Sequence, residues 1–315
     1  TSDEIIEILD GINDSVYADT DAFWMDAGWY WKTPGVKLES WMETGTWLVD
    51  THRFPTEFAA ISEHGAKHGV KTLLWFEPEM ARLPENESDP EGIPYKYHLL
   101  GSPLVDMGDP DFVDWCFDRF SSILDKGQIS LYRQDYGVNP AVIFTHPEIN
   151  TEGRVGMMEN RYARGYWGLW DKLIDRYPDM MIDDCAAGGG RNDIDSMRRA
   201  VPLHKTDHDY SRQDDKQAMH QSLFGWLPYF GACMVGPDKC GEVNPYMIHS
   251  TYAPWVALCA NIYAEGYDWD CLRRYTELWR ELNPYYTADY YPLTTWSRGD
   301  KAWRGWEFYD PKTGG

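Results

Sequence analysis

Short apolar runs alternate with amphipathic segments along most of this chain, and this alternation constrains the fold more than any other feature. Runs such as DAFWMDAGWY (21–30) and KTLLWFEPEM (71–80) are typical of strands that are buried on both faces. Segments such as 55–69 and 109–127 carry apolar residues three and four positions apart, which is typical of helices. Strands that alternate with helices predict a parallel sheet. Further strands are predicted over 128–136, 179–190, 201–210, 231–237 and 251–263, and further helices over 161–178 and 211–227.

The residues at the ends of these strands indicate which parallel fold forms. Nearly every predicted strand ends, on its C-terminal side, in an acidic, basic or thiol side chain. A (β/α)8 barrel assembles its active site from the C-terminal ends of many strands, whereas an open doubly wound sheet concentrates ligand groups at one switch point. The sequence therefore predicts an α/β fold of the TIM-barrel type. The strand-end residues are Asp26, Glu77, Glu79, Arg133, Asp135, Asp184, Cys185 and Asp207.

Both ends of the chain bear on the predicted domains. Seven predicted strands leave a barrel one strand short, and residues 1–14 have the pattern of a capped helix, so the missing strand can lie before residue 1. After residue 288, aromatic residues alternate with turn residues, which is typical of β structure. We therefore predict a catalytic barrel over 1–288, whose first strand can be missing, and the start of a C-terminal β-sandwich domain over 289–315.

Charge and aromatic content narrow the class of partner. Asp and Glu (51) outnumber Lys and Arg (29), which gives a formal net charge of −22. So acidic a surface repels phosphate backbones and anionic lipids, and we expect neither a nucleic-acid nor a membrane partner. The chain also holds 16 Trp, 21 Tyr and 11 Phe residues. Because rings stack on sugar faces and carboxylates accept hydrogen bonds from hydroxyls, this composition favours a neutral polyhydroxy ligand.

The motifs predict neither a cofactor nor a metal. The six cysteines form no C-x-x-C pair, and we find no histidine cluster at metal-ligand spacing, so the cysteines are expected to be buried free thiols. The glycine run in IDDCAAGGGRND (182–193) matches no phosphate-loop pattern, which argues against a nucleotide-binding enzyme. The compartment stays open between secreted, periplasmic and cytoplasmic, and a homo-oligomer is one option for the assembly.

Two strand-end aspartates have the properties that glycosidic bond cleavage requires. One carboxylate attacks the anomeric carbon or directs water, and a second carboxyl group protonates the leaving oxygen. Asp135 shares a strand face with Arg133, and a neighbouring cation favours the ionised form that a nucleophile needs. Asp207 follows another predicted strand, where a poorly solvated pocket would keep it protonated. Either aspartate could instead be an ion-pairing or capping residue at a strand end.

Tryptophans lie beside carboxylates in two of the strand-end segments. Asp26 and Trp29 belong to DAGWYW (26–31), and Trp75 opens WFEPEM (75–80). A carboxylate accepts from sugar hydroxyls and an indole packs on the apolar face of a sugar, so both segments are predicted walls of a monosaccharide pocket. Each tryptophan taken alone is equally compatible with a place in the core.

The order of these segments resembles that of the melibiase-type α-galactosidases, a glycoside hydrolase family with a (β/α)8 catalytic domain. The resemblance implies a retaining mechanism with Asp135 as the nucleophile and Asp207 as the general acid/base. It further implies that Asp26 binds the region of the 4- and 6-hydroxyls and that Trp75 lines the pocket. The likeness runs from about Ala22 to about Trp296 and includes D-x-G-W (26–29), L-W-F-E-P-E-M (74–80), a basic-x-Asp strand end (133–135), C-x-x-G-G-G-R (185–191), T-D (206–207) and Y-P-L-T (291–294).

The same resemblance implies roles for four more residues. Arg133 would be the cation near the nucleophile, and Cys185 and the Gly188 backbone would lie by the 2-substituent of the sugar. Arg191 would either bind substrate or only brace the glycine loop. The implied partner is an oligosaccharide or glycan substrate, and the implied chemistry needs no cofactor.

Departures from the family pattern bear on the substrate. Members usually carry two adjacent aspartates before Gly-Trp, where this chain has Ala27 second, and usually carry Lys-Trp-Asp, then Asn two residues on, where this chain has Gln134 and Gly137. Loss of a hydroxyl-binding carboxylate weakens selection for galactose. The predicted function is a retaining exo-acting α-glycosidase of the α-galactosidase type. The alternatives are an α-N-acetylgalactosaminidase, an α-galactosaminidase whose amine would meet Asp183 or Asp184, and a non-catalytic carbohydrate-binding barrel.

Overall fold

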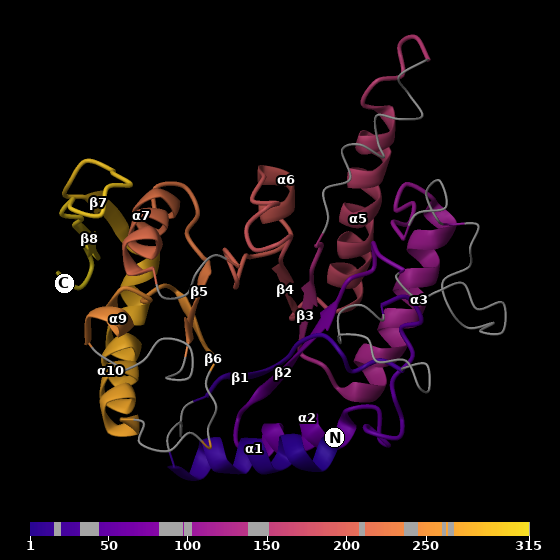
Figure 1. Cartoon of the computed structure of the whole chain (residues 1–315), viewed down its shortest axis with the longest axis horizontal. Helices are drawn as coiled ribbons and strands as arrows, with labels where there is room; N and C mark the ends of the chain where they lie inside the picture. The colour runs from indigo at the N-terminus through magenta and orange to yellow at the C-terminus, as the bar shows by residue number, and fades with distance from the viewer. Residues whose placement is uncertain are drawn as a thin grey trace. The chain divides into compact units, whose positions relative to one another are not determined.

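A computed structural model of the chain describes residues 1–15, 20–31, 44–81, 97, 103–137, 151–207, 212–235, 245–259, 263 and 268–314 (Figure 1). The chain divides into two compact units. The first comprises Thr1–Asn13 and Asp19–Ala200, and the second comprises Asp14–Ala18 and Val201–Gly315. The predicted domain boundary at residue 288 lies inside the second unit and stays a prediction.

A four-stranded parallel sheet forms the centre of the first unit, in the order β1-β2-β3-β4. Because the spatial order equals the order along the chain, each crossover leads to the adjacent strand, as in a barrel. The carboxyl ends of all four strands consequently meet at one edge. The strands are β1 (Ala22–Met25), β2 (Lys71–Phe76), β3 (Leu131–Gln134) and β4 (Met181–Asp184), each inside a predicted run, so these four predictions are confirmed.

Helices connect these strands, and local sequence signals set their ends. α1 begins with the predicted capping box, in which the Glu4 amide donates to Thr1 Oγ1 at 3.4 Å. α3 has Pro110 in its first turn and an Asp109 side chain that caps the Asp111 amide, and it packs against α5. The helices of the first unit are α1 (Ser2–Ser15), α2 (Ala59–Lys67), α3 (Pro110–Gly127), α5 (Met157–Arg176) and α6 (Ile194–Met197).

Aromatic side chains make up much of the core of the first unit. Phe76 on β2 stacks on Tyr132 on β3 with ring centroids 4.9 Å apart, and Phe120 of α3 lies 4.7 Å from Phe76. Trp47 and Trp170 are also fully buried in this cluster. Burial of rings of this size contributes most of the hydrophobic stabilisation of such a core.

The described residues of the second unit form two two-stranded sheets. β5 (Gly231–Val235) pairs in parallel with β6 (Trp255–Cys259), and β7 (Asp289–Pro292) pairs antiparallel with β8 (Trp306–Tyr309). The strands predicted over 231–237 and 251–263 are thereby confirmed where they are described. The helices are α7 (Gln213–Leu223), α9 (Pro245–His249), α10 (Trp269–Leu282) and the 3-10 helix η4 (Asn283–Thr287).

The strand predicted over 201–210 is wrong for its described part, residues 201–207, which form no regular strand. Pro202 has no N–H to give to a ladder, and only its carbonyl is used, as acceptor from the Gly231 amide at 2.8 Å. The Lys205 ammonium group donates to the Gly231 carbonyl at 3.3 Å. One backbone hydrogen bond and one side-chain hydrogen bond therefore hold this segment beside β5.

Two sequence predictions concern burial and hydropathy. Within the described part of the chain, no helix combines the length and apolar character that a bilayer span requires. Of the five described cysteines, Cys116, Cys185 and Cys233 are buried as predicted. Cys271 is only half-buried and Cys259 is exposed, so the prediction of burial is wrong for Cys259. Cys240 lies outside the described residues.

Candidate active site

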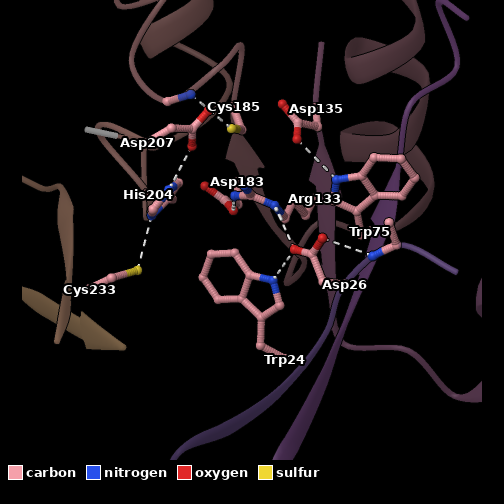
Figure 2. Close-up of polar contacts among 12 residues, drawn as sticks. Trp24, Asp26, Trp75, Arg133, Asp135, Asp183, Cys185, His204, Asp207 and Cys233 are labelled. Atoms are coloured by element: carbon pink, nitrogen blue, oxygen red, sulfur yellow. Dashed lines mark hydrogen bonds and ion pairs between the residues drawn. The ribbon is translucent and has the colours of Figure 1, made fainter. Parts of the chain in front are cut away.

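Arg133 is the buried cation at the carboxyl edge of the first sheet. Its Nη1 pairs with Asp183 Oδ2 on the neighbouring strand β4, and its Nε lies 3.7 Å from Asp26 Oδ2 (Figure 2). The guanidinium also lies 4.5 Å from the ring centroid of Trp24. Burial works against the charged form, but the nearby carboxylates, Asp183 foremost, outweigh it and raise the pKa of Arg133 well above its usual range. Arg133 is therefore a permanent positive charge.

Asp135 follows β3 directly and is half-buried. Its Oδ2 accepts from Trp75 Nε1 at 3.2 Å (Figure 2). Its Oδ1 accepts from the Tyr136 amide at 2.7 Å. Burial would raise the pKa of Asp135, but the charge of Arg133 and hydrogen bonds from Cys185, Trp75 and Tyr136 hold it below its ordinary value. The carboxylate is thus ionised at neutral pH, which is the charge state expected from the sequence.

Trp75, which bonds to Asp135, is itself held by a hydrogen bond from Trp29. Both indoles are 2% exposed, and Trp29 Nε1 donates to the Trp75 carbonyl at 2.8 Å. Trp29 also packs edge-on against Phe58 and Phe76, with ring centroids 5.6 and 5.4 Å away. The structure therefore places Trp29 in the aromatic core. Of the two tryptophans, Trp75 is the one that donates to Asp135.

Asp26 is the exposed carboxylate of this edge, with 58% of its side chain accessible to solvent. Trp24 Nε1 and the Ala27 amide donate to its two oxygens at 2.9 and 2.8 Å. These two donors fix the carboxylate while the side chain stays accessible, which is what a hydroxyl-binding group requires. Arg133 and Asp26 therefore lie together at this edge.

The glycine run after β4 folds back on itself. Cys185 Sγ accepts from the Gly188 amide at 3.3 Å, and the Ala186 amide donates to the Gly188 carbonyl at 2.8 Å. Gly188 has a φ of +80°, and a Cβ on Gly190 would lie 2.4 Å from the Ala186 carbonyl oxygen, so this turn needs both glycines. Burial raises the pKa of the Cys185 thiol, which is therefore neutral.

Arg191 lies behind the sheet edge in a buried polar network. It pairs with Glu79, and its guanidinium lies 4.4 Å from the ring centroids of both Tyr136 and Tyr166. Glu79 is fully buried and also accepts from Tyr162 OH at 2.8 Å. Of the two roles expected for Arg191, these contacts correspond to the bracing of the loop.

Gln134 belongs to the same network, which explains a departure from the family pattern. Its amide nitrogen donates to Glu79 Oε1 at 2.8 Å, and its amide oxygen accepts from Trp170 Nε1 at 2.8 Å and Tyr132 OH at 2.9 Å. Side chains alternate along a strand, so Gln134 points away from the face that carries Arg133. The expectation that this departure lies in the substrate pocket is therefore wrong.

Asp183 and Asp184 lie on opposite faces of β4. Asp183 is neutralised by Arg133, its partner in the strand register. Asp184 is paired in register with Gln134, and neither of its buried carboxyl oxygens has a hydrogen-bond partner among the described residues. Burial, with Asp183 and Glu79 nearby, raises the pKa of Asp184 well above its usual range, so it is a neutral acid. An amine-binding role for this pair receives no support from these contacts.

In the second unit, a buried histidine holds Asp207. His204 Nε2 lies 2.8 Å from Asp207 Oδ1, and His204 Nδ1 lies 3.0 Å from Cys233 Sγ on β5 (Figure 2). His204 and Cys233 are buried, whereas the Asp207 side chain is 57% exposed. Burial lowers the pKa of neighbouring Lys205 to about 7, and its ammonium faces the Gly231 carbonyl. Sequence reasoning missed His204, because residues three positions apart on an extended strand do not share a face.

The parallel sheet of the first unit, in chain order and with charged residues at its carboxyl edge, is compatible with a TIM-type (β/α)8 barrel, and solved structures of this class share the fold. The chain superimposes on the α-galactosidase of Lactobacillus brevis with a TM-score of 0.75 at 18% identity, over 99% of this chain and 42% of that one. It superimposes equally, with a TM-score of 0.75 at 16% identity, on the GH36 α-galactosidase AgaA of Geobacillus stearothermophilus in complex with raffinose, over 99% of this chain and 44% of that one. The predicted fold class is confirmed.

The Melibiase family profile matches residues 1–210, and the chain belongs to this family. Among characterised relatives, α-galactosidase Mel36A of Lactobacillus acidophilus is 28% identical over 247 residues, which cover 75% of this chain and 32% of that protein. The chain thus spans about a third of that relative. The resemblance inferred from the ordered motifs is confirmed.

Proposed function

We propose that this chain provides the catalytic barrel of a retaining exo-acting α-glycosidase of the α-galactosidase type. The observation that carries the proposal is the ionised Asp135, held by Trp75 beside the permanent charge of Arg133. A glycosidase nucleophile must be charged and fixed in place, and these contacts do both. Relatives named as α-galactosidases, one solved in complex with raffinose, favour an oligosaccharide substrate with terminal α-linked galactose-like sugars.

In the first step, a carboxylate oxygen of Asp135 attacks the anomeric carbon. A C–O bond to Asp135 forms while the glycosidic C–O bond breaks, and the proton of Asp207 goes to the leaving oxygen. The products of this step are a covalent glycosyl-enzyme and the free alcohol of the aglycone. Trp75 Nε1 and the Tyr136 amide keep the carboxylate from rotating away from the sugar.

In the second step, water releases the sugar. Asp207, now a carboxylate, takes a proton from water as the oxygen of that water attacks the anomeric carbon, and the ester bond to Asp135 breaks. Two displacements at one carbon retain its configuration. His204 acts on Asp207 as a positioning residue, because its Nε2 contacts Oδ1 while Cys233 holds the other ring nitrogen.

Substrate selection is assigned to the exposed side of the first-unit edge. Asp26 accepts hydrogen bonds from the region of the 4- and 6-hydroxyls, with its two oxygens oriented by Trp24 and the Ala27 amide. Cys185 and Gly188 lie near the 2-substituent. Because Ala27 replaces a second carboxylate, the site discriminates less strongly for galactose than one with both carboxylates, and α-N-acetylgalactosaminides are the next substrates to test.

The proposal is tested with a panel of nitrophenyl α-glycosides: galactoside, N-acetylgalactosaminide, galactosaminide and glucoside. Turnover of a member, with the α-anomer as the first product seen by NMR, would support a retaining α-glycosidase and identify its sugar. Formation of the β-anomer first would refute retention. No turnover on any member, together with sugar-dependent quenching of tryptophan fluorescence, would indicate a non-catalytic sugar-binding barrel.

A further inference from the structure

Two histidines of the α2 region and an aspartate of α1 bring three metal-ligand groups together in the first unit. His64 lies in the last turn of α2, His68 is its C-cap residue, and Asp10 lies on α1. His68 comes three residues before the start of β2, so the cluster is at the amino end of that strand. Asp135 is at the opposite, carboxyl end of the sheet and takes no part in the cluster.

The geometry brings one ligand atom from each residue close to the other two. Asp10 Oδ1 and His64 Nε2 are 2.6 Å apart, and the rings of His64 and His68 have centroids 5.4 Å apart. The three ligand atoms all lie within 4.8 Å of one another. Zinc bonds to nitrogen and oxygen are about 2.0–2.2 Å long, so an ion between these atoms needs only small side-chain rotations.

The chemistry of the three groups favours a borderline transition metal over Mg²⁺ or Ca²⁺. Histidines four positions apart lie on one helix face, and imidazole suits Zn²⁺, whereas the harder ions prefer a shell of oxygens. Asp10 is 51% exposed and His64 19%, so an ion can enter from solvent and retain water as its fourth ligand. The net charge of −22 also raises the local concentration of cations.

From this arrangement we propose that Asp10, His64 and His68 bind one Zn²⁺ ion, which links α1 to α2. In the structure His64 Nε2 and Asp10 Oδ1 contact each other directly, and the ion takes the place of this hydrogen bond. Bound between them, the ion joins α1 and α2 through residues that are 54 positions apart in the sequence. The site is structural, because it is remote from the strand-end carboxylates. It corrects the expectation of no histidine cluster at metal-ligand spacing.

Zn²⁺ binding is measured on chelator-treated, reduced protein that carries no histidine tag. Equilibrium dialysis with metal analysis should give one Zn²⁺ bound through this cluster, and His68→Gln should weaken that binding at least tenfold. Saturating Zn²⁺ should raise Tm by roughly 2–4 °C in the parent and by less than half of that in His68→Gln. Asp10→Asn, which keeps the side-chain size, should show the same loss.

His52→Gln is the matched control, since His52 is an exposed histidine of the same unit outside the cluster. It should retain parent-like Zn²⁺ affinity and the full rise in Tm. If the parent, His68→Gln and Asp10→Asn bind Zn²⁺ equally, the ion is elsewhere and the proposal is wrong. It is equally wrong if Zn²⁺ binds through these residues without raising the Tm of the parent, because α1 and α2 are then not joined.

Discussion

Trp75 on β2 donates its indole N–H to the carboxylate of Asp135, the first residue after β3, so two adjacent strands jointly define the orientation of one carboxylate. The bond crosses the parallel register in which Trp75 pairs with Arg133. Trp75 thus fixes the orientation of the Asp135 carboxylate, and its register partner Arg133 favours the charged form. A substitution at either position removes one contribution and leaves the other.

We predict that Trp75→Phe lowers kcat/KM more than it lowers stability. The substitution keeps a six-membered aromatic ring and removes the N–H with the rest of the indole, and a hydrogen bond to a charged group contributes about 1.5–3 kcal/mol. If that energy is lost in the transition state, kcat/KM falls roughly 10–100-fold. Trp29→Phe is the control, because it removes the same part of a buried indole but breaks the bond to the Trp75 carbonyl and not the bond to Asp135. It should cost roughly 2–3 kcal/mol of unfolding free energy in urea, from the hydrogen bond and the lost packing together, and leave kcat within a few-fold.

Replacement of the proposed nucleophile gives a second prediction. Asp135→Ala should abolish turnover, since no carboxylate is left to form the glycosyl-enzyme. Azide added to this variant should restore release of the aglycone and yield a glycosyl azide, which mass spectrometry and NMR identify. Unchanged activity in the variant would remove Asp135 from the mechanism.

The contact between His204 and Asp207 predicts a dependence on the leaving group. Asp207→Ala should impair an oligosaccharide far more than a dinitrophenyl glycoside, because a good leaving group needs no proton. His204→Gln should show the same bias in milder form, roughly tenfold between the two substrates. Equal losses in Asp207→Ala would contradict its acid role, whereas a biased Asp207→Ala with an unbiased His204→Gln would contradict only the positioning role.

Asp184 predicts a pH-dependent stability of unusual sign. Its pKa is raised in the folded protein by burial, so the folded state holds a proton that the unfolded chain releases above about pH 3.9. Stability contributed by this group therefore falls as pH rises, by up to about 1.4 kcal/mol per pH unit until the folded-state pKa is reached. The free energy of unfolding of Asp184→Asn, measured in urea, should therefore increase relative to that of the parent as the pH rises from 4 to 7. A constant difference across this range would show that Asp184 titrates normally.

Strand periodicity explains what could be predicted from the sequence. Residues two apart share a face, which correctly grouped Arg133 with Asp135, and the same rule would have placed Gln134 on the other face had it been applied. Residue type did not distinguish Trp29 from Trp75, and burial does not either, since both are equally buried. Their contacts separate them, because Trp75 donates to Asp135 and Trp29 donates to the Trp75 carbonyl.

Contacts that are distant in sequence, or that depend on irregular backbone, were beyond local reasoning. Asp10 meets His64 across 54 residues, so the H-x-x-x-H spacing of the α2 region lacked a visible third ligand. The contact between His204 and Asp207 exists because Pro202 interrupts a strand that the apolar pattern predicted. Neither contact could be predicted, because the tertiary fold and not the local sequence pattern brings these side chains together.

The network around Gln134 separates the departures from the family pattern into one that can be changed alone and one that cannot. Conversion of Gln134 to the tryptophan usual in the family would remove the amide that satisfies Glu79 and force a larger ring against Tyr132 and Trp170, so it requires compensating changes in the same round. Ala27 can be replaced without compensating changes, because its side chain is partly exposed and its hydrogen bond to Asp26 is made by the backbone amide. A directed-evolution library for substrate range should therefore diversify position 27 and leave position 134 unchanged, because the Gln134 side chain points away from the face that carries Arg133.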